Sequence, residues 1–241
     1  MRLLRHLARG LLYSVLVAAT LLLLAVVALR WLNPPASAFM AEAAVAALLA
    51  GEHGYATHYQ WVDLEQISPQ AALAVIASED QQFPLHAGFD FKSIREAVRH
   101  NARSRHVRGA STISQQVAKN LFLWSGGGYF RKGLEAGLTL LVEWCWPKER
   151  ILEVYLNIAE FGRGIYGVQA AALHYFHEDA RRLNRADSAL LAAVLPNPRR
   201  LRVDAPSAYV WARSEWIAQQ MQDLGGTAYL NLVEEDLARH R

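Results

Sequence analysis

Residues 68–90 read SPQAALAVIASEDQQFPLHAGFD, and this stretch sets the character of the chain. Ser68 as N-cap and Pro69 at the first helical position predict a helix that carries apolar residues up to Glu79. That helix ends in two adjacent carboxylates, Glu79 and Asp80, where the negative end of the helix macrodipole disfavours negative charge. Folding gives no reason for this acid pair. A carboxylate in a partly desolvated cleft has a raised pKa and can take a proton from a sugar hydroxyl.

The chain after this stretch follows helical periodicity, and well-alternating strands are scarce, so the class is mainly α. Asp90 and Ser111 are the N-caps we expect for the next two helices. Helices are predicted at residues 91–103, 112–122, 129–144, 147–159, 167–176 and 187–194, with a packing helix from 209 onward.

Residues 108–124, RGASTISQQVAKNLFLW, have an unusual polar face. Thr112, Gln116 and Lys119 fall within an arc of about 60° on one side of the predicted helix. A row of hydroxyl, amide and ammonium groups is a suitable lining for a groove that holds a polar ligand.

Residues 131–144, RKGLEAGLTLLVEW, combine a predicted core stripe with charges on its flank. Arg131 and Glu135 stand one helical turn apart, and Arg131, Lys132 and Lys119 together make a cationic patch able to hold a pyrophosphate. The core stripe is expected to be Leu134, Leu138, Leu141 and Cys145.

Each of these patterns also has an ordinary structural interpretation. The acid pair can be a surface feature with His86 as its partner, and the polar row can be a solvated helix face. Taken one at a time, the patterns favour these readings.

The first thirty residues are the most informative part outside these motifs. Leu11 to Leu29 has no charge and is close to the length of a membrane-spanning helix. Arg2, Arg5 and Arg9 precede it, and after Arg30 no Lys or Arg follows until Lys92, so the positive-inside rule places the N-terminus in the cytoplasm. The alternative is a cleaved signal peptide with an A-x-A type site at residues 36–38.

Length and composition allow one good-sized domain plus an anchor in 241 residues. We expect a cytoplasmic tail at 1–10, a transmembrane anchor at 11–30, a linker at 31–60, the catalytic domain at 61–225 and a C-terminal tail at 226–241. The net charge of +3 gives no reason to expect a nucleic-acid partner, and the single Cys145 excludes an intramolecular disulfide.

Five motifs that follow one another in the chain favour a functional interpretation over these structural ones. They are ED-x-x-F-x-x-H-x-G-x-D at 79–90, GASTISQQ at 109–116, RKGLE at 131–135, KERILEVYLN at 148–157 and GRGIYGVQAAALHYF at 162–176. Together they resemble the signature motifs of the peptidoglycan glycosyltransferases, glycosyltransferase family 51, over about residues 61–199. Two departures lie in the last motif, where His177 follows in place of the expected Gly and Gln169 stands where Glu is common.

The resemblance implies a lysozyme-like, two-lobed helical domain with a small membrane-proximal jaw near residues 104–109. The substrate would be lipid II, a disaccharide pentapeptide on an undecaprenyl pyrophosphate carrier, and the product a β-1,4-linked glycan strand. Glu79 would be the general base and Glu135 the second catalytic acid. Arg131, Lys132 and Lys119 would lie near the donor phosphates. Thr112, Gln116 and Asn120 would line the donor side, and Asp80, Phe83 and His86 would support the first motif.

The resemblance calls for no organic cofactor and leaves room for a divalent cation, Mg²⁺ or Mn²⁺, at the pyrophosphate. It implies a single-pass protein of the bacterial plasma (inner) membrane with its catalytic domain on the periplasmic or external face. Membrane lipid, the nascent strand and proteins of cell-wall synthesis or division are the partners to expect.

Two other functions stay open on the sequence. A lytic muramidase-like hydrolase would use one Glu as general acid and water as acceptor, but it needs no pyrophosphate site. A membrane-tethered scaffold with a dead site would need neither Glu79 nor Glu135. No serine is followed by Lys in an S-x-x-K pattern, so the chain is expected to be monofunctional, without a transpeptidase domain.

Overall fold

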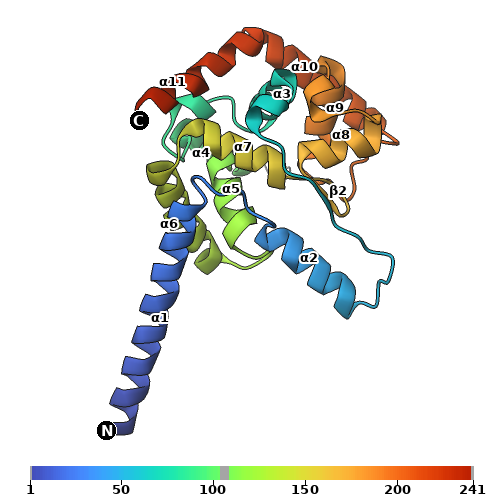
Figure 1. Ribbon diagram of the computed structural model, residues 1–241. Helices are drawn as coiled ribbons and strands as arrows, with labels where there is room; N and C mark the ends of the chain where they lie inside the picture. Colours follow the sequence, from blue (N-terminus) through green and yellow to red (C-terminus); the bar gives the residue numbers. More distant parts are fainter. Residues whose placement is uncertain (1, 104–108, 240–241) are drawn as a thin grey trace. The chain divides into compact units, whose positions relative to one another are not determined.

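The computed structural model describes residues 2–103 and 109–239, and the chain divides into two units, residues 1–34 and 35–241 (Figure 1). The mainly α class is confirmed. The helices are α1 (Arg2–Ala28), α2 (Ala38–Leu49), α3 (Pro69–Glu79), α4 (Phe91–Asn101), α5 (Ile113–Phe122), α6 (Tyr129–Cys145), α7 (Lys148–Ile158), α8 (Val168–Phe176), α9 (Arg185–Val194), α10 (Ala208–Asp223) and α11 (Asn231–Arg239). Short 3₁₀ turns are η1 (Leu64–Gln66), η2 (Phe83–Leu85), η3 (Ala180–Arg182) and η4 (Gly226–Leu230).

The first unit is essentially the helix α1. Within it, Arg5–Ala28 is 24 residues long with a mean hydropathy of 2.7, which is long and apolar enough to cross a membrane. The helix suggests a membrane anchor, as the sequence predicts.

Helix α7 is the centre of the second unit. Its residues 150–152 and 154–158 are all buried, because apolar side chains occupy nearly every face of this helix. Ile151, Tyr155 and Ile158, the expected core stripe, are each no more than 1% exposed. Fully burying an Ile or Leu side chain stabilises a fold by roughly 1.5–3 kcal/mol, so this helix is a major source of stability.

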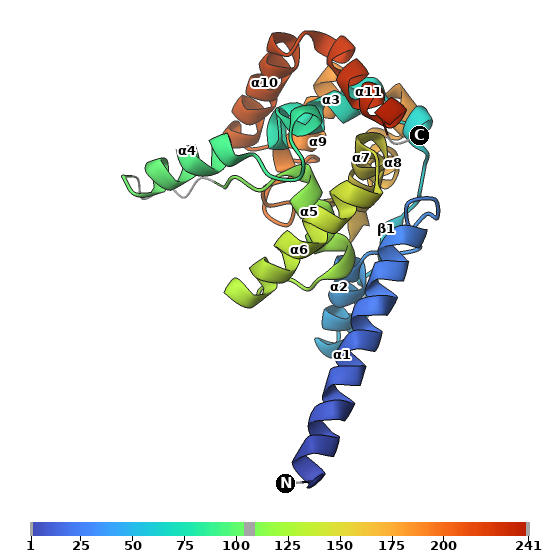
Figure 2. The same cartoon turned by 90° about the vertical axis from the view of Figure 1, so that its left-hand side faces the viewer.

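Two groups of helices pack around this centre (Figures 1 and 2). Helices α3, α9 and α10 contact one another, and α5 packs on both α6 and α7. A small sheet lies beside them, with β1 (His58–Tyr59) parallel to the central β3 (Ile165–Tyr166) and β2 (Glu160–Gly162) antiparallel to it. This is the helical lysozyme-like fold that the motifs imply.

Asn157 fastens the beginning of the compact domain to its centre. The fully buried amide of Asn157 accepts a hydrogen bond from Val62 N at 3.0 Å and donates to Val62 O at 2.9 Å. A buried side-chain amide needs such partners, so this pairing explains Asn157 as a structural residue.

Helix α4 buries little of its apolar surface. Phe91 and Val98 on this helix are exposed, at 68% and 65%. Only Ala97 of α4 is buried, and Figure 2 shows the helix projecting from the other helices of its unit. Residues 104–108, where we place most of the jaw, lie outside the described residues.

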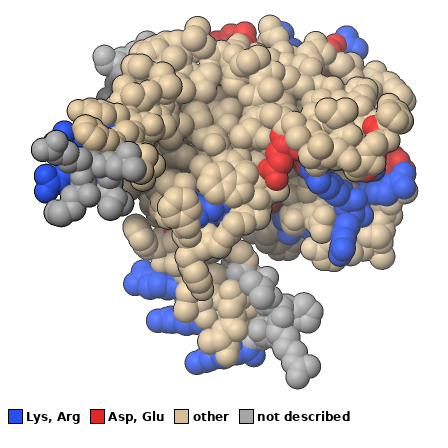
Figure 3. Space-filling model, turned by 90° about the horizontal axis from the view of Figure 1, so that it is seen from below, with Lys and Arg blue, Asp and Glu red and all other residues tan. Residues whose placement is uncertain are grey.

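The surface carries the mildly basic character expected from the sequence pI of about 9.1. On the face in Figure 3, Lys and Arg side chains gather in separate groups, and acidic side chains accompany only some of them. At the C-terminus, residues 226–239, which we expected to form a tail, are helical, and α11 packs against α7.

The two departures in the last motif have structural reasons. His177 ends α8 in the left-handed conformation, with φ of 58°, which glycine adopts at lower cost. The buried Gln169 donates from Nε2 to Asp179 Oδ1 at 3.0 Å and accepts from Ala180 N at 2.9 Å. A neutral amide suits this place because a carboxylate would face Asp179.

We expect Gln169→Glu to lower the free energy of unfolding by about 3 kcal/mol at neutral pH, since it places two carboxylates together in a buried site. Thermal and denaturant unfolding of the detergent-solubilised chain measure this. The double variant Gln169→Glu/Asp179→Asn restores a donor and an acceptor, so it should recover most of the loss. Equal stability of the single variant and the wild type would contradict this account.

Candidate active site

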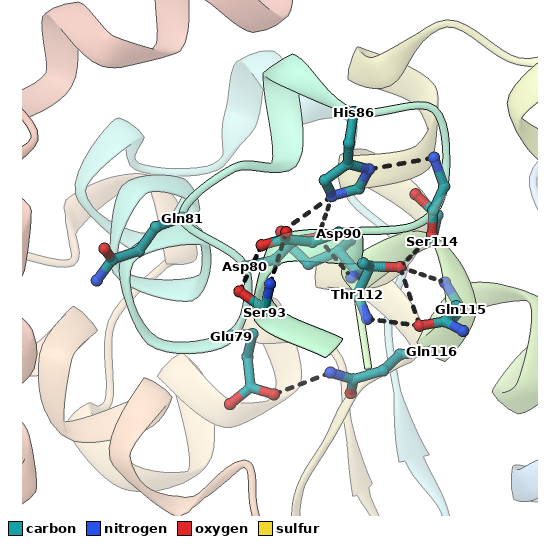
Figure 4. Close-up of polar contacts among 12 residues, drawn as sticks. Glu79, Asp80, Gln81, His86, Asp90, Ser93, Thr112, Ser114, Gln115 and Gln116 are labelled. Carbon is teal, nitrogen blue, oxygen red and sulfur yellow. Dashed lines mark hydrogen bonds and ion pairs between the residues drawn. The ribbon is translucent and has the colours of Figure 1, made fainter. Parts of the chain in front are cut away.

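Glu79 is the last residue of α3, where α3, α5 and α10 meet. Gln116 Nε2 of α5 donates to Glu79 Oε2 at 2.9 Å (Figure 4), and Arg213 Nη2 of α10 lies 3.6 Å from Oε1. The Glu79 side chain is 13% exposed, so it is largely desolvated but reachable. Two different helices therefore hold the two oxygens of this carboxylate.

Burial raises the pKa of Glu79 above its ordinary value. The hydrogen bond from Gln116 and the charges of Arg213 and Lys119 lower the pKa, and the neighbouring Asp80 raises it, but desolvation is the largest cause. A carboxylate with a raised pKa is a stronger base than a solvated one. Among the described groups, Glu79 has the environment that a general base requires.

Glu79 and Tyr155 contact the two ends of the Gln116 amide. Its hydroxyl lies 3.2 Å from Gln116 Oε1, and burial raises the pKa of Tyr155 well above its ordinary value. The amide orientation follows from Glu79, because an ionised carboxylate can only accept and therefore takes its hydrogen bond from Nε2. Gln116 Oε1 then accepts from the Tyr155 hydroxyl, which supports the same orientation.

Asp80 has a different role from its neighbour. Both of its oxygens lie 3.0 Å from His86 Nε2, and Oδ2 also accepts from Ile113 N, the first residue of α5, at 3.0 Å (Figure 4). Asp80 is 7% exposed. Both oxygens of this carboxylate are thus used in contacts within the fold, and His86 is one of the two partners.

Thr112 is the N-cap of α5, whereas we expected Ser111. The Thr112 hydroxyl accepts from Gln115 N at 3.2 Å and donates to Gly88 O at 2.7 Å, and Gln115 Oε1 accepts from Thr112 N. Thr112 is 2% exposed. It is thus used within the fold, while Gln116 and Lys119 of the same row face the site.

Gly88 is required at this junction. Its φ is +88°, and a Cβ there would lie 2.8 Å from Thr139 Cγ2. Any larger residue would push the first motif away from α6.

Glu135 is buried, although we placed it on the flank of α6. Its side chain is 2% exposed, with Oε2 2.8 Å from Arg131 Nη1 and Oε1 bonded to Lys132 Nζ. The buried face of α6 consists of Glu135, Leu138, Thr139 and Val142. Of the expected stripe, Leu138 is buried and Leu141 and Cys145 are half-buried, whereas Leu134 is 40% exposed, so the prediction is wrong at Leu134. A buried charge is tolerated here because two cations neutralise it.

Lys119 is electrostatically coupled to both acids. Burial lowers the pKa of Lys119, the charge of Glu135 raises it most among the charged neighbours, and Glu79 also raises it. Arg131 and Lys132 act on the same ammonium and lower its pKa. One helical position further along, Asn120 Oδ1 is buried without a hydrogen-bond partner among the described residues. Lys119, Arg131 and Lys132 thus form a positively charged site, and the Asn120 side-chain oxygen is an acceptor that the described residues leave unused.

A second buried charge network explains Phe83. Lys148 Nζ lies 2.7 Å from Glu143 Oε1, which also accepts from the Ser114 hydroxyl, and 4.6 Å from the centre of the Phe83 ring. Breaking such a pair costs about 3–5 kcal/mol. The network ties α5, α6 and α7 together beneath the first motif.

Sequence reasoning missed Arg213, Tyr155 and the Lys148–Glu143 pair. The only signal for Arg213 was its place on a helical face of α10, because its partner Glu79 is distant in sequence. A cavity of about 680 Å³ lies elsewhere, between Leu64, Arg150 and Val233. Among the described residues no group of three or more His, Cys, Asp or Glu side chains is placed to hold a metal.

The fold is of the helical lysozyme-like class, and it brings the largely desolvated carboxylate of Glu79 together with the partly exposed cations Lys119, Arg131 and Lys132. The transglycosylase family model matches residues 46–222. The chain is similar to proteins named biosynthetic peptidoglycan transglycosylase: that of Xylella fastidiosa is 52% identical over 93% of this chain and 92% of the relative. Those of Escherichia coli, at 58% identity over 84% of each chain, and Salmonella arizonae, at 55% over 92% and 93%, carry the same name. The chain belongs to the transglycosylase family.

We expect Arg213→Gln to raise the pKa of Glu79 further, since it removes a positive charge 3.6 Å from the carboxylate. Carbon-13 NMR titration of labelled glutamate side chains measures this, with Glu79→Gln to assign the signal. Because the folded state holds this proton more tightly than the unfolded chain, the stability that it contributes is lost as the pH rises through the folded pKa. The exposed Arg202→Gln is the control and should leave the titration unchanged; a Glu79 pKa equal in both variants would refute the contact.

Proposed function

We propose that this chain polymerises the glycan strands of peptidoglycan from lipid II by inverting glycosyl transfer, as a monofunctional peptidoglycan glycosyltransferase in cell wall biogenesis. The observation that carries the proposal is the largely desolvated Glu79, whose pKa is raised, beside the cations Lys119, Arg131 and Lys132. Membership of the transglycosylase family supports it.

Glu79 acts as the general base. Its carboxylate takes the proton from the 4-hydroxyl of the GlcNAc of the acceptor, and the oxygen attacks C1 of the donor's MurNAc. The bond between C1 and the phosphate oxygen breaks with its electron pair, and undecaprenyl pyrophosphate leaves with inversion at C1. Gln116 and Arg213 contact Glu79 and lower its pKa. Desolvation outweighs their effect, so the pKa of Glu79 stays raised.

The cationic cluster stabilises the negative charge that develops on the leaving diphosphate. Arg131 and Lys132 are held in place by Glu135, whose two oxygens they bind. We expected Glu135 to be the second catalytic acid; its burial favours a positioning role, in which it fixes both cations and limits their net charge. Lys119, with its lowered pKa, is the third donor to the diphosphate.

The donor side also uses neutral groups. Asn120 offers a buried oxygen that can accept a hydrogen bond from a substrate hydroxyl or amide. Gln116 adds its amide beside Glu79, whereas Thr112 supports this side through the cap of α5. Asp80, Phe83 and His86 keep the first motif in place.

Among the residues that the structure describes, no acids and histidines cluster as a metal site would require. We propose that protein cations contact the diphosphate directly. A divalent cation, Mg²⁺ or Mn²⁺, would come with the diphosphate oxygens, which are ligands that both ions prefer. No organic cofactor enters the reaction that we propose.

Helix α1 anchors the enzyme where its substrates are. Both substrates carry polyprenyl chains, so confining enzyme and substrate to one membrane raises their effective concentration. We propose that the membrane is the bacterial plasma membrane, with Arg5 and Arg9 cytoplasmic and the catalytic domain on the outer side. Proteins of cell-wall synthesis or division working on the same strand would be its partners.

Two single-cysteine variants test this orientation in a Cys145→Ala background. We expect Gln66→Cys, which is exposed in the second unit, to react with a membrane-impermeant maleimide on intact spheroplasts. His6→Cys, before the anchor, should react only after lysis. The reverse pattern would overturn the orientation, and release of the domain into the soluble fraction would indicate a cleaved signal peptide.

We expect Glu79→Gln to abolish polymer formation while lipid II binding is retained, since the change removes a base with almost no change in volume. Gel analysis of products from purified lipid II and a separate binding titration measure the two effects. In the wild type, activity should fall as the pH is lowered through the raised pKa of Glu79, because the base must be unprotonated.

Two comparisons keep this experiment specific. Arg131→Ala should weaken lipid II binding about tenfold through the lost phosphate contact, whereas Arg131→Lys should recover part of it. Clearing of isolated sacculi in place of polymer ladders would favour a hydrolase, and inactivity of the wild type a scaffold. Substantial turnover by Glu79→Gln would falsify the assignment of the base.

A further inference from the structure

Helix α10 has a row of large polar and aromatic side chains next to its core face. Tyr209, Arg213, Trp216 and Gln220 follow the spacing i, i+4, i+7 and i+11, so they fall within an arc of about 60°. We call these four residues the α10 row. The core face of the same helix, Val210, Ser214, Ile217 and Met221, is buried and accounts for how α10 is held in the fold.

The α10 row borders the proposed catalytic base. Arg213 Nη2 lies 3.6 Å from Glu79 Oε1, and Gln220 Oε1 accepts from Gln81 Nε2 at 2.9 Å. The α10 row therefore lies beside Glu79 and Gln81, which begin the first motif. Gln116 contacts Glu79 from a different helix, α5. None of the five sequence motifs includes the α10 row.

The aromatic members of the row are open to solvent. Tyr209 is 58% exposed and Trp216 is 47% exposed, and the Arg213 guanidinium carbon lies 6.0 Å from the centre of the Trp216 ring. Arg213 Nε is buried with no hydrogen-bond partner among the described residues. Flat aromatic faces, a guanidinium and an amide in one row offer stacking surfaces with hydrogen-bonding groups between them.

Charge and position indicate the ligand. Pyranose rings present C–H edges that pack on aromatic faces and hydroxyls that bond to amide and guanidinium groups. Glu79 is held from one side by α5, which also carries Lys119, and from the other side by α10. With the diphosphate at Lys119, Arg131 and Lys132, the sugars of the donor strand beyond the reacting unit extend away from these cations.

We propose that the α10 row is a sugar-binding subsite for the donor glycan strand, where Tyr209 and Trp216 stack on pyranose rings that have passed the reacting residue. The subsite rests on the proposed function for its ligand. Holding the strand there keeps the growing chain bound between additions and limits its loss.

A lipid-free tetrasaccharide of alternating GlcNAc and MurNAc tests the subsite, because it lacks the diphosphate that the cations hold. Titration of the nitrogen-15-labelled full chain in detergent micelles follows the tryptophan indole signals. We expect the Trp216 signal to shift, and Trp216→Leu and Tyr209→Leu each to weaken binding about fivefold or more. Leucine keeps apolar bulk and removes the flat ring, whereas Trp216→Phe should retain most of the binding.

Trp211 provides the matched control. It is 52% exposed on the same helix and stands roughly 140° or more around the axis from the row. Trp211→Leu should leave tetrasaccharide binding and polymer length unchanged, whereas Trp216→Leu should shorten the polymers and leave the pH profile in place. Circular dichroism checks folding; if Trp216→Leu unfolds, Tyr209→Leu and the wild-type indole shifts decide.

The outcomes separate the subsite from the proposed function. Tetrasaccharide binding that is equal in wild type, Trp216→Leu and Tyr209→Leu, with an unmoved Trp216 signal, overturns the subsite even if polymer is made. Binding that depends on Trp216 in a chain that makes no polymer supports the subsite and counts against the proposed function. Binding of a protein partner on this face without any tetrasaccharide binding also overturns it.

Discussion

The rest of the site depends on the hydrogen bonds that the carboxylate of Asp80 accepts. This carboxylate lies at the end of α3, where the macrodipole disfavours it, and at the beginning of α5, where the free amide of Ile113 favours it. One bond thus joins the two helices that carry Glu79 and Gln116. His86 holds the same carboxylate, and Thr112 connects the cap of α5 to Gly88. This junction fixes α5, and therefore Gln116, next to Glu79.

Charge is distributed unequally across the site, and this inequality suits the chemistry. Glu135 is neutralised by two cations in a buried place, whereas Glu79 has one amide and one guanidinium at 3.6 Å. The first arrangement fixes positive charge where a diphosphate would bind. The second leaves a carboxylate whose pKa is raised by burial. The charges of both acids raise the pKa of Lys119, so this ammonium group couples the two places electrostatically.

Local sequence signals predicted the helices well. Tertiary contacts decided which residue caps α5, which face of α6 is buried and which side chains meet at the site. Ser68 and Pro69 begin α3 as expected, because capping is encoded within one turn. Two neighbouring hydroxyls could cap α5, and Thr112 is chosen because its side chain also reaches Gly88. In α6, leucines lie on two faces, so periodicity alone could not show that Glu135 belongs to the buried one. Arg213 could not be found at all, since its partner comes from a helix far away in sequence.

The contrast between two adjacent acids assigns their roles more firmly than either does alone. Asp80 is bonded by His86 and by a backbone amide, so a proton on this carboxylate would weaken contacts that hold the fold together. Glu79, one residue earlier, keeps capacity on Oε1, where a guanidinium lies beyond close hydrogen-bonding distance. Because the Glu79 carboxylate can only accept, it holds the Gln116 amide with Nε2 towards it, and Tyr155 donates to the other end of that amide. At the helix end that looks unfavourable in the sequence, one acid therefore stabilises the fold, and the other keeps an oxygen available, as the proposed base requires.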